Sequence, residues 1–219
     1  MINLVTTFLH AWTYFLSHQT EFFQATRAHL ELSGIALGFA ILVCIPLGIW
    51  TSRSRLASLT FMNLVNGLRV LPSLAVLFLV IPYLGLSTTS AAVALILLAM
   101  PPVLINTDAA FRTLDPAVLE AARGMGMSTM QVLFRVEFPL AMPVILAGIR
   151  TASVEVIASA TLAAFVGSGG LGIYITRGFA LFDYGILMVG AVPVAMLTLI
   201  VEGMLAGLQY LAQPVHLSA

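Results

Sequence analysis

Long apolar runs, separated by short polar stretches, dominate this chain of 219 residues. The most sharply bounded run covers residues 32–50, which carry no charge, and Arg53 and Arg55 follow it at once. Four more runs lie at about 59–84, 89–111, 140–166 and 185–211, and each is as long as the roughly 20 residues that a helix needs to cross a bilayer. We therefore predict an all-α, polytopic membrane protein with about five transmembrane helices.

The first thirty residues have a different pattern. Their apolar stretch at 8–16 is too short to cross a bilayer, and charges at Glu21 and Arg27 follow it. Aromatic side chains are frequent here, as in helices that lie at a membrane surface: Trp12, Tyr14, Phe15, Phe22 and Phe23. We predict an N-terminal interfacial segment at 1–30 and a transmembrane domain at 31–219. A sixth span within residues 1–30 is the alternative, and the charges disfavour it.

Composition supports a membrane protein and excludes several other classes. Hydrophobic residues make up 60% of the chain and charged residues 8%, whereas soluble domains carry about 25% charged residues. The mean hydropathy is +1.06. The formal net charge is zero, so we expect no nucleic-acid partner, which would need a basic face. The single cysteine, Cys44, lies in an apolar run without metal-ligand spacing, and we expect no metal.

The arginines orient the predicted spans. With five spans, one side of the membrane receives Arg53, Arg55, Arg112, Arg123 and Arg135, and the other side receives Arg27 and Arg177. Arginine and lysine are enriched in cytoplasmic loops, so the richer side should face the cytoplasm. This places the N-terminus outside and the C-terminus inside.

The polar segment at 112–139 is the most informative part of the chain, and it should form a cytoplasmic loop. Asp115 stands directly before Pro116, which is the pattern of an N-cap carboxylate followed by proline at the first helical position. A short helix is therefore predicted over 116–123.

Signals for a turn and a second short helix follow. Gly124 and Gly126 bracket a predicted turn, because glycine readily takes the left-handed conformation that ends a helix. Ser128, with Gln131 three residues later, predicts a capping box that starts the next helix. Pro139 should mark the point where that helix gives way to the next span.

This segment resembles the cytoplasmic loop of bacterial ABC-importer permeases. Their pattern is E-A-A, three residues, G, nine residues, then I-x-L-P. The matching residues here are Glu120, Ala121 and Ala122, then Gly126, then Val136, Glu137, Phe138 and Pro139. Valine and phenylalanine replace the usual isoleucine and leucine. The resemblance implies that the first short helix is a coupling helix that docks in a groove of an ATPase subunit. It assigns ATPase coupling to Glu120, Ala121, Ala122, Gly126 and Pro139.

The resemblance covers nearly all of the chain after His29. Within the permeases, the chain is similar to the osmoprotectant branch, which imports glycine betaine, choline and carnitine. It implies the ABC type I importer permease (MetI-like) fold in the bacterial inner membrane. The implied partners are ATP-binding ABC subunits, a second permease copy or related permease, an extracytoplasmic substrate-binding protein and the lipid bilayer. Methionine permeases share the G-x-G-G-L-G segment at 167–172, so methionine or another amino acid is the alternative cargo.

Nothing in the sequence indicates catalysis. The chain has no G-x-x-x-x-G-K-[ST] motif and no lysine, so it cannot bind ATP as a P-loop protein does. We expect no cofactor in this chain, and ATP hydrolysis on a separate partner chain.

Polar residues inside the predicted spans need an explanation, because a charge in hydrocarbon is unfavourable. The candidates for a translocation pathway are Asn66, Arg69, Asn106, Arg150 and Glu155. Structural pairing inside the bundle explains them equally well. A third interpretation is a stand-alone channel or ion-coupled carrier that uses Arg69, Arg150 and Glu155. Carriers usually contain internal repeats, and none is visible here. Pro72 also falls within the predicted second span.

Overall fold

The chain folds as a bundle of helices over residues 4–212, the part that the computed structural model describes, and this part contains no strand. The helices are α1 (Leu4–Ser17), α2 (Gln19–Ser52), α3 (Arg55–Val70), α4 (Ser73–Leu84), α5 (Thr88–Arg112), α6 (Pro116–Gly124), α7 (Thr129–Val132), α8 (Phe138–Ser159), α9 (Gly172–Ala180) and α10 (Tyr184–Ala212). A π-helical turn (Leu133–Glu137) precedes α8, and a 3-10 helix (Ala160–Val166) follows it. The predicted all-α class is confirmed.

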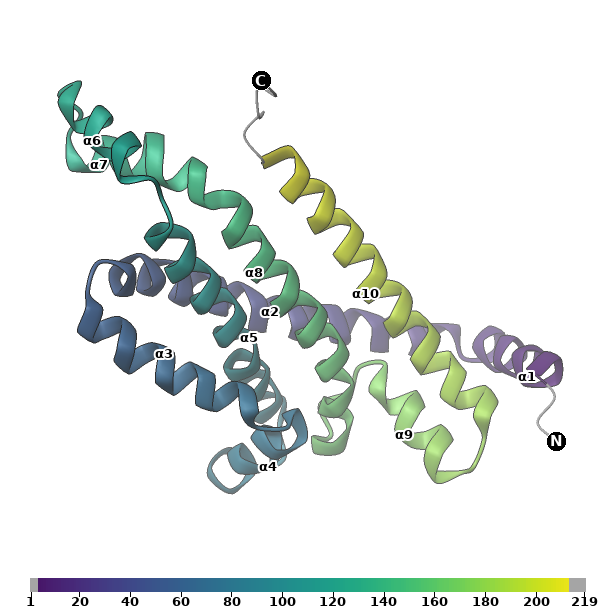
Figure 1. Cartoon of the computed structure of the whole chain (residues 1–219). Helices are drawn as coiled ribbons and strands as arrows, with labels where there is room; N and C mark the ends of the chain where they lie inside the picture. Colours follow the sequence, from purple (N-terminus) through teal and green to yellow (C-terminus); the bar gives the residue numbers. More distant parts are fainter. Residues whose placement is uncertain (1–3, 213–219) are drawn as a thin grey trace.

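Four helices of the described part are long and apolar enough to cross a membrane. They are α2, α5, the continuous helix Thr129–Val166 and α10, and a fifth span results if the bent pair α3 and α4 is counted as one. The prediction of about five spans is confirmed in this form. Figure 1 shows the loop with α6 and α7 at one end of the bundle and α9 near the other end.

The second predicted span is not one continuous helix. α3 ends at Val70, α4 begins at Ser73, and the two are bent by 103° at the break. Pro72 explains the break, because a proline pushes the preceding residue out of the helical conformation. Leu71 is indeed extended, with φ −73° and ψ 129°.

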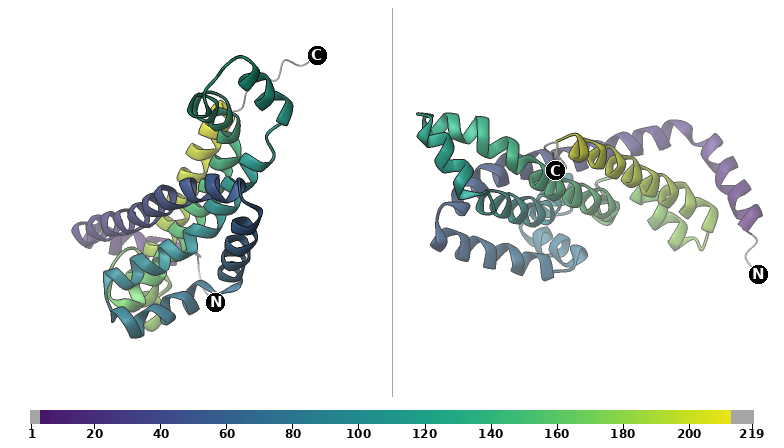
Figure 2. Two further views of the ribbon diagram at one scale, coloured as in Figure 1. Left: turned by 90° about the vertical axis from the view of Figure 1, so that its left-hand side faces the viewer. Right: turned by 45° about the horizontal axis from the view of Figure 1, so that its top comes forward.

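α2 begins earlier than expected, at Gln19 instead of residue 32, so the predicted domain boundary at 30/31 falls inside this helix. A helix of 34 residues is about 51 Å long, which exceeds the roughly 30 Å hydrocarbon core. Figure 2 shows α1 turning away from the axis of α2. α1 packs on α10 instead, where Ala11 belongs to a buried cluster with Ile186 and Val189.

α5 is the centre of the bundle, with α2 on one side and α8 on the other (Figure 1). Small residues allow this close packing. A Cβ on Gly48 of α2 would lie 2.6 Å from the Thr107 side chain. A Cβ on Gly148 of α8 would lie 2.7 Å from the carbonyl oxygen of Pro102. Glycines therefore hold α2 and α8 directly against the helix that leads into the polar loop.

The glycine-rich segment after the fourth span connects to a short helix, α9, that the sequence pattern did not reveal. Gly167, Gly169 and Gly170 have φ values of 72°, 81° and 82°, which only glycine adopts easily. The chain thereby reverses within a few residues. α9 then packs closely on α10, since a Cβ on Gly178 would lie 2.4 Å from the backbone nitrogen of Leu187.

Candidate functional site

The first helix of the polar loop forms as its sequence predicts. The Asp115 side chain accepts a hydrogen bond from the backbone N–H of Ala117 at 2.9 Å. Pro116 occupies the first turn, and α6 extends to Gly124, one residue beyond the prediction. The N-cap at Asp115 is confirmed.

The turn after α6 depends on one glycine, Gly126, which has φ +82°. Gly124 instead closes the helix without a positive φ. A Cβ on Gly126 would meet no atom within 4 Å, so glycine is needed for the backbone conformation and not for space. The capping box that follows is confirmed: the Ser128 N–H donates to Gln131 Oε1 at 2.8 Å, and the Gln131 N–H donates to Ser128 Oγ at 3.4 Å.

The prediction that the helix gives way at Pro139 is wrong, because Thr129–Val166 is continuous. Pro139 lies in the first turn of α8, directly after the π-helical turn. Proline lacks an N–H, and its ring crowds the carbonyl four residues earlier. A turn with i→i+5 spacing is wider than an α-helical turn and leaves room for that ring. The helix therefore widens at Leu133–Glu137 and then continues.

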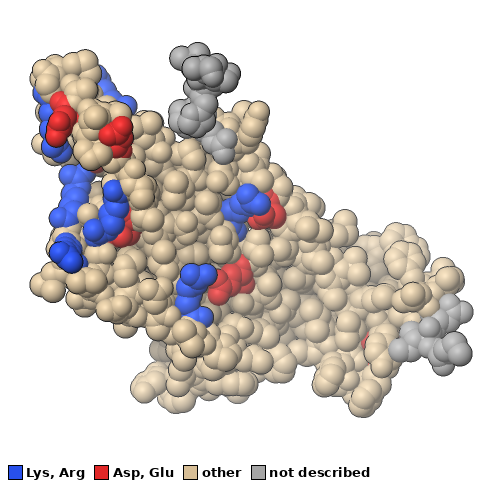
Figure 3. Space-filling model, viewed as in Figure 1, with Lys and Arg blue, Asp and Glu red and all other residues tan. Residues whose placement is uncertain are grey.

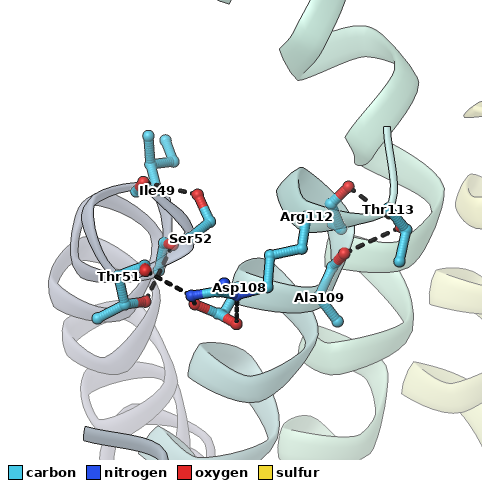
Figure 4. A network of polar contacts seen from close by, with 9 residues as sticks. Ile49, Thr51, Ser52, Asp108, Ala109, Arg112 and Thr113 are labelled. Atoms are coloured by element: carbon cyan, nitrogen blue, oxygen red, sulfur yellow. Dashed lines mark hydrogen bonds and ion pairs between the residues drawn. The ribbon is translucent and has the colours of Figure 1, made fainter. Parts of the chain in front are cut away.

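Two arginine contacts fasten both ends of the loop to the end of α2. Arg53 Nη2 donates to Glu137 Oε2 at 2.6 Å, and the Glu137 side chain is 8% exposed. Arg112 Nε donates to Asp108 Oδ2 at 2.7 Å, and its Nη2 donates to the Thr51 carbonyl oxygen at 2.7 Å (Figure 4). The ends of α2 and α5 and the start of α8 are thus held together beneath α6 and α7. We call these contacts the arginine clamps.

The loop presents a mixed apolar and charged surface. Glu120 and Ala121 are exposed, whereas Ala122 is buried in the chain's own packing at 2% exposure. Large apolar side chains are exposed around them: Val118, Met125, Met130 and Phe134. Charged side chains gather at this end of the molecule, while the middle of the same face carries only two small mixed groups (Figure 3). An exposed apolar patch with a charged rim is typical of a protein-binding surface.

A second polar feature lies between α8 and α10. Arg150 forms an ion pair with Glu202, and its Nη1 donates to Gln209 Oε1 at 3.3 Å. Glu155 does not pair with Arg150 but lies in the same groove of about 450 Å³. Arg69, from α3, contributes to the electrostatic surroundings of Glu155. Arg150 and Glu155 are thus the two of the five predicted pathway residues that line this groove, and Arg69 lies outside its lining.

The two predicted asparagines, Asn66 and Asn106, also lie outside this groove. The Asn106 side chain donates to the Pro102 carbonyl oxygen at 2.8 Å and packs against Gly148, which is a structural role. Asn66 is exposed on α3, and its side chain forms no hydrogen bond within the described part of the chain. Sequence reasoning missed Gln209, although its spacing of seven residues from Glu202 places both on one face of a helix.

Residues 4–212 contain no group of three or more His, Cys, Asp or Glu side chains that could hold a metal ion. The features that stand out are thus the loop surface, the clamps and the polar groove. A model of one protein family, the binding-protein-dependent transport system inner membrane component, matches residues 44–211. The chain belongs to this family. The permease class and the inner-membrane location inferred from the loop motif are thereby confirmed.

Individual members of this transport family resemble the chain over most of its length. It is 40% identical to the carnitine transport permease protein OpuCB of Listeria monocytogenes, with 92% of this chain and 93% of that protein covered. It is 40% identical to the choline transport system permease protein OpuBB of Bacillus subtilis, covering 85% and 86%. It is 34% identical to the osmoprotectant import permease protein OsmW of Salmonella typhimurium, covering 92% and 96%.

A solved structure of an inward-facing MetNI methionine ABC transporter has the same fold. Its TM-score is 0.80 at 20% identity, with 90% of this chain and 99% of that chain covered. The predicted MetI-like permease fold is confirmed. At this identity the likeness concerns the fold and says nothing about cargo.

Proposed function

We propose that this chain is the membrane-spanning permease subunit of an ATP-driven importer for small osmoprotectants such as glycine betaine, choline or carnitine. The observation that carries the proposal is the agreement of the relatives: three permeases that share 34–40% of their residues with it are named for carnitine, choline or osmoprotectants. The methionine transporter shares only 20%. Methionine or another amino acid remains the alternative cargo that the experiment below tests.

The loop surface is the proposed contact for the ATP-binding subunits, which would hydrolyse ATP on the cytoplasmic side. Exposed Glu120 and Ala121 would meet the partner, together with the apolar side chains beside them. The remaining predicted coupling residues would set the conformation of the loop and would not contact the partner. Ala122 is packed inside, Gly126 makes the turn, and Pro139 follows the π-helical turn that orients the loop.

A second permease would complete the pathway. The polar groove on α8 and α10 holds Arg150, Glu155 and Glu202, and charged groups in a membrane are expected to face protein or water, not lipid. We propose that the second permease covers this groove and that the pathway runs beside it. A related, non-identical partner fits the relatives, since one Bacillus subtilis system has two named permeases that are 39% and 34% identical to this chain.

Reconstitution tests the proposal. The chain, co-expressed with its candidate ATPase, second permease and substrate-binding protein, would be placed in liposomes with ATP inside. We expect ATP-dependent uptake of labelled betaine, carnitine or choline, and none with an ATPase that cannot hydrolyse ATP. Glu120→Lys should insert normally and lose uptake. Uptake of methionine but of no quaternary ammonium compound would assign the alternative cargo. Uptake that needs no ATP would refute the importer class.

A further inference from the structure

A cleft of about 310 Å³ opens between the first turns of α2 and the glycine-rich segment that leads into α9. Its polar lining consists of Glu21, Gln24, Gly169, Gly170, Tyr174 and Arg177. The volume lies in the range of sites for small molecules. The cleft lies on a different part of the chain from the loop, the clamps and the groove between α8 and α10, and none of those features accounts for it.

The length of α2 places this cleft outside the hydrocarbon. Glu21 precedes the end of α2 at Ser52 by about 31 residues, which corresponds to about 46 Å along the helix. The hydrocarbon core is only about 30 Å thick. If the end of α2 near the loop faces the cytoplasm, as the arginines predict, Glu21 lies beyond the outer boundary of the hydrocarbon. Small solutes on that side can therefore reach the cleft.

The cleft contains two opposite charges that form no direct ion pair with each other. Glu21 enters from α2 and Arg177 from α9, and none of the ion pairs in the described part of the chain joins them. Arg177 donates one hydrogen bond, to the Tyr14 hydroxyl at 3.0 Å. That bond, and more weakly the charge of Glu21, raises the pKa of Arg177, so the guanidinium stays charged. Four of its five N–H donors have no partner in residues 4–212.

Two buried polar side chains, His29 and Ser168, lie next to the lining of the cleft without forming part of it. His29 Nε2 donates to the Ile157 carbonyl oxygen at 3.0 Å, which leaves Nδ1 as an acceptor. That atom has no partner in the described residues, His29 is 1% exposed, and a Cβ on Gly170 would lie 3.3 Å from it. Ser168 Oγ is also buried without a partner there. Buried polar atoms normally find hydrogen bonds, so two unpaired ones beside one cleft indicate bound water or ligand.

We propose that this cleft binds a small zwitterion, with its carboxylate on Arg177 and its ammonium group beside Glu21. Tyr174 borders the cleft but is only 3% exposed, so the Glu21 carboxylate provides the main attraction for the ammonium group. The choice of an osmolyte rests on the proposed function, and the site would receive it on the side where the binding protein delivers it. A zwitterionic lipid headgroup has the same pair of charges, so the test separates the two sources.

The test compares betaine, which has both charges, with choline, which has only the cation. The complete transporter is reconstituted with Arg177→Gln, Glu21→Gln or the control Arg27→Gln, which removes an exposed arginine of α2 that pairs with Glu31 and does not line the cleft. Losing a charge-assisted contact to the carboxylate should lower the betaine-to-choline ratio of uptake efficiency about tenfold in Arg177→Gln. Glu21→Gln should reduce uptake of both solutes. Arg27→Gln should change the ratio less than twofold.

Direct binding completes the experiment. Equilibrium dialysis of labelled betaine against the purified complex, without binding protein, should show binding that Arg177→Gln weakens. Normal wild-type uptake with an unchanged ratio in Arg177→Gln would overturn the site and leave the proposed function standing. Variant effects that appear only in phosphatidylethanolamine liposomes, and not in phosphatidylglycerol liposomes, would assign the cleft to a headgroup and overturn binding of the solute. Failure of wild-type uptake itself would instead overturn the proposed function.

Discussion

The clamp between Arg53 and Glu137 allows a quantitative test of how the loop is held. Glu137 is almost fully buried and Arg53 is 45% exposed, with 2.6 Å between the paired atoms. Breaking a fully buried pair costs about 3–5 kcal/mol, whereas an exposed pair contributes about 0–1 kcal/mol. Arg53→Ala leaves the buried carboxylate unpaired but near water, so we expect a loss of about 2 kcal/mol. For a chain of this size that lowers the melting temperature by about 4–8 °C.

Thermal denaturation of the purified chain in detergent measures this loss. Arg55→Ala is the matched control, because Arg55 is an exposed arginine two residues away that forms no ion pair with any described residue. The double variant Arg53→Ala/Glu137→Ala should recover part of the lost stability, since it also removes the buried carboxylate that Arg53→Ala leaves unpaired. If Arg53→Ala and Arg55→Ala melt at the same temperature, the clamp contributes nothing and the reasoning is refuted.

Three further predictions follow from other parts of the chain. Gly126→Val should weaken co-purification of the ATPase, because a β-branched residue is strained at φ +82°. Gly126→Asn should retain co-purification, because asparagine tolerates that conformation. Equal co-purification with the two variants would exclude the backbone explanation. Reporter fusions after Arg55 and after Ala219 should both report cytoplasm, and a periplasmic signal at either would contradict the orientation. Gly178→Ala should destabilise the fold by about 1–3 kcal/mol, because the added Cβ would lie 2.4 Å from the backbone of Leu187. Thermal denaturation should show this as a lower melting temperature. An unchanged melting temperature would show that α9 can shift freely.

The sequence predicted features that depend on neighbouring residues. The cap at Asp115, the turn at Gly126 and the capping box at Ser128 are each made by groups within a few positions of one another, so their geometry follows from local chemistry. The spans that became α5 and α10 were located within two residues at each end, because hydrophobicity over 20 residues is a strong signal.

Features that depend on distant parts of the chain were missed. Arg150 pairs with Glu202 on another helix, 52 residues away, and its sequence neighbourhood gives no sign of this partner. Prolines were also ambiguous. Pro72 breaks a span whereas Pro139 does not, because the turn before Pro139 widens to accept its ring. The sequence shows that a proline is present but not how the backbone around it adapts.

The π-helical turn before α8 also gives the loop a property that concerns insertions and deletions. Each residue of an α-helix rotates the chain by about 100°, and a π-helical turn contains about one residue more than the α-helical turn it replaces. Removing one residue from Leu133–Glu137 would therefore return the backbone to regular helix and turn α6 and α7 by about 100° about the axis of α8. The direction in which the loop projects is thus encoded by chain length at one place. Point substitutions can weaken binding to the loop surface. A deletion of one residue at this turn would instead change the direction in which the surface faces.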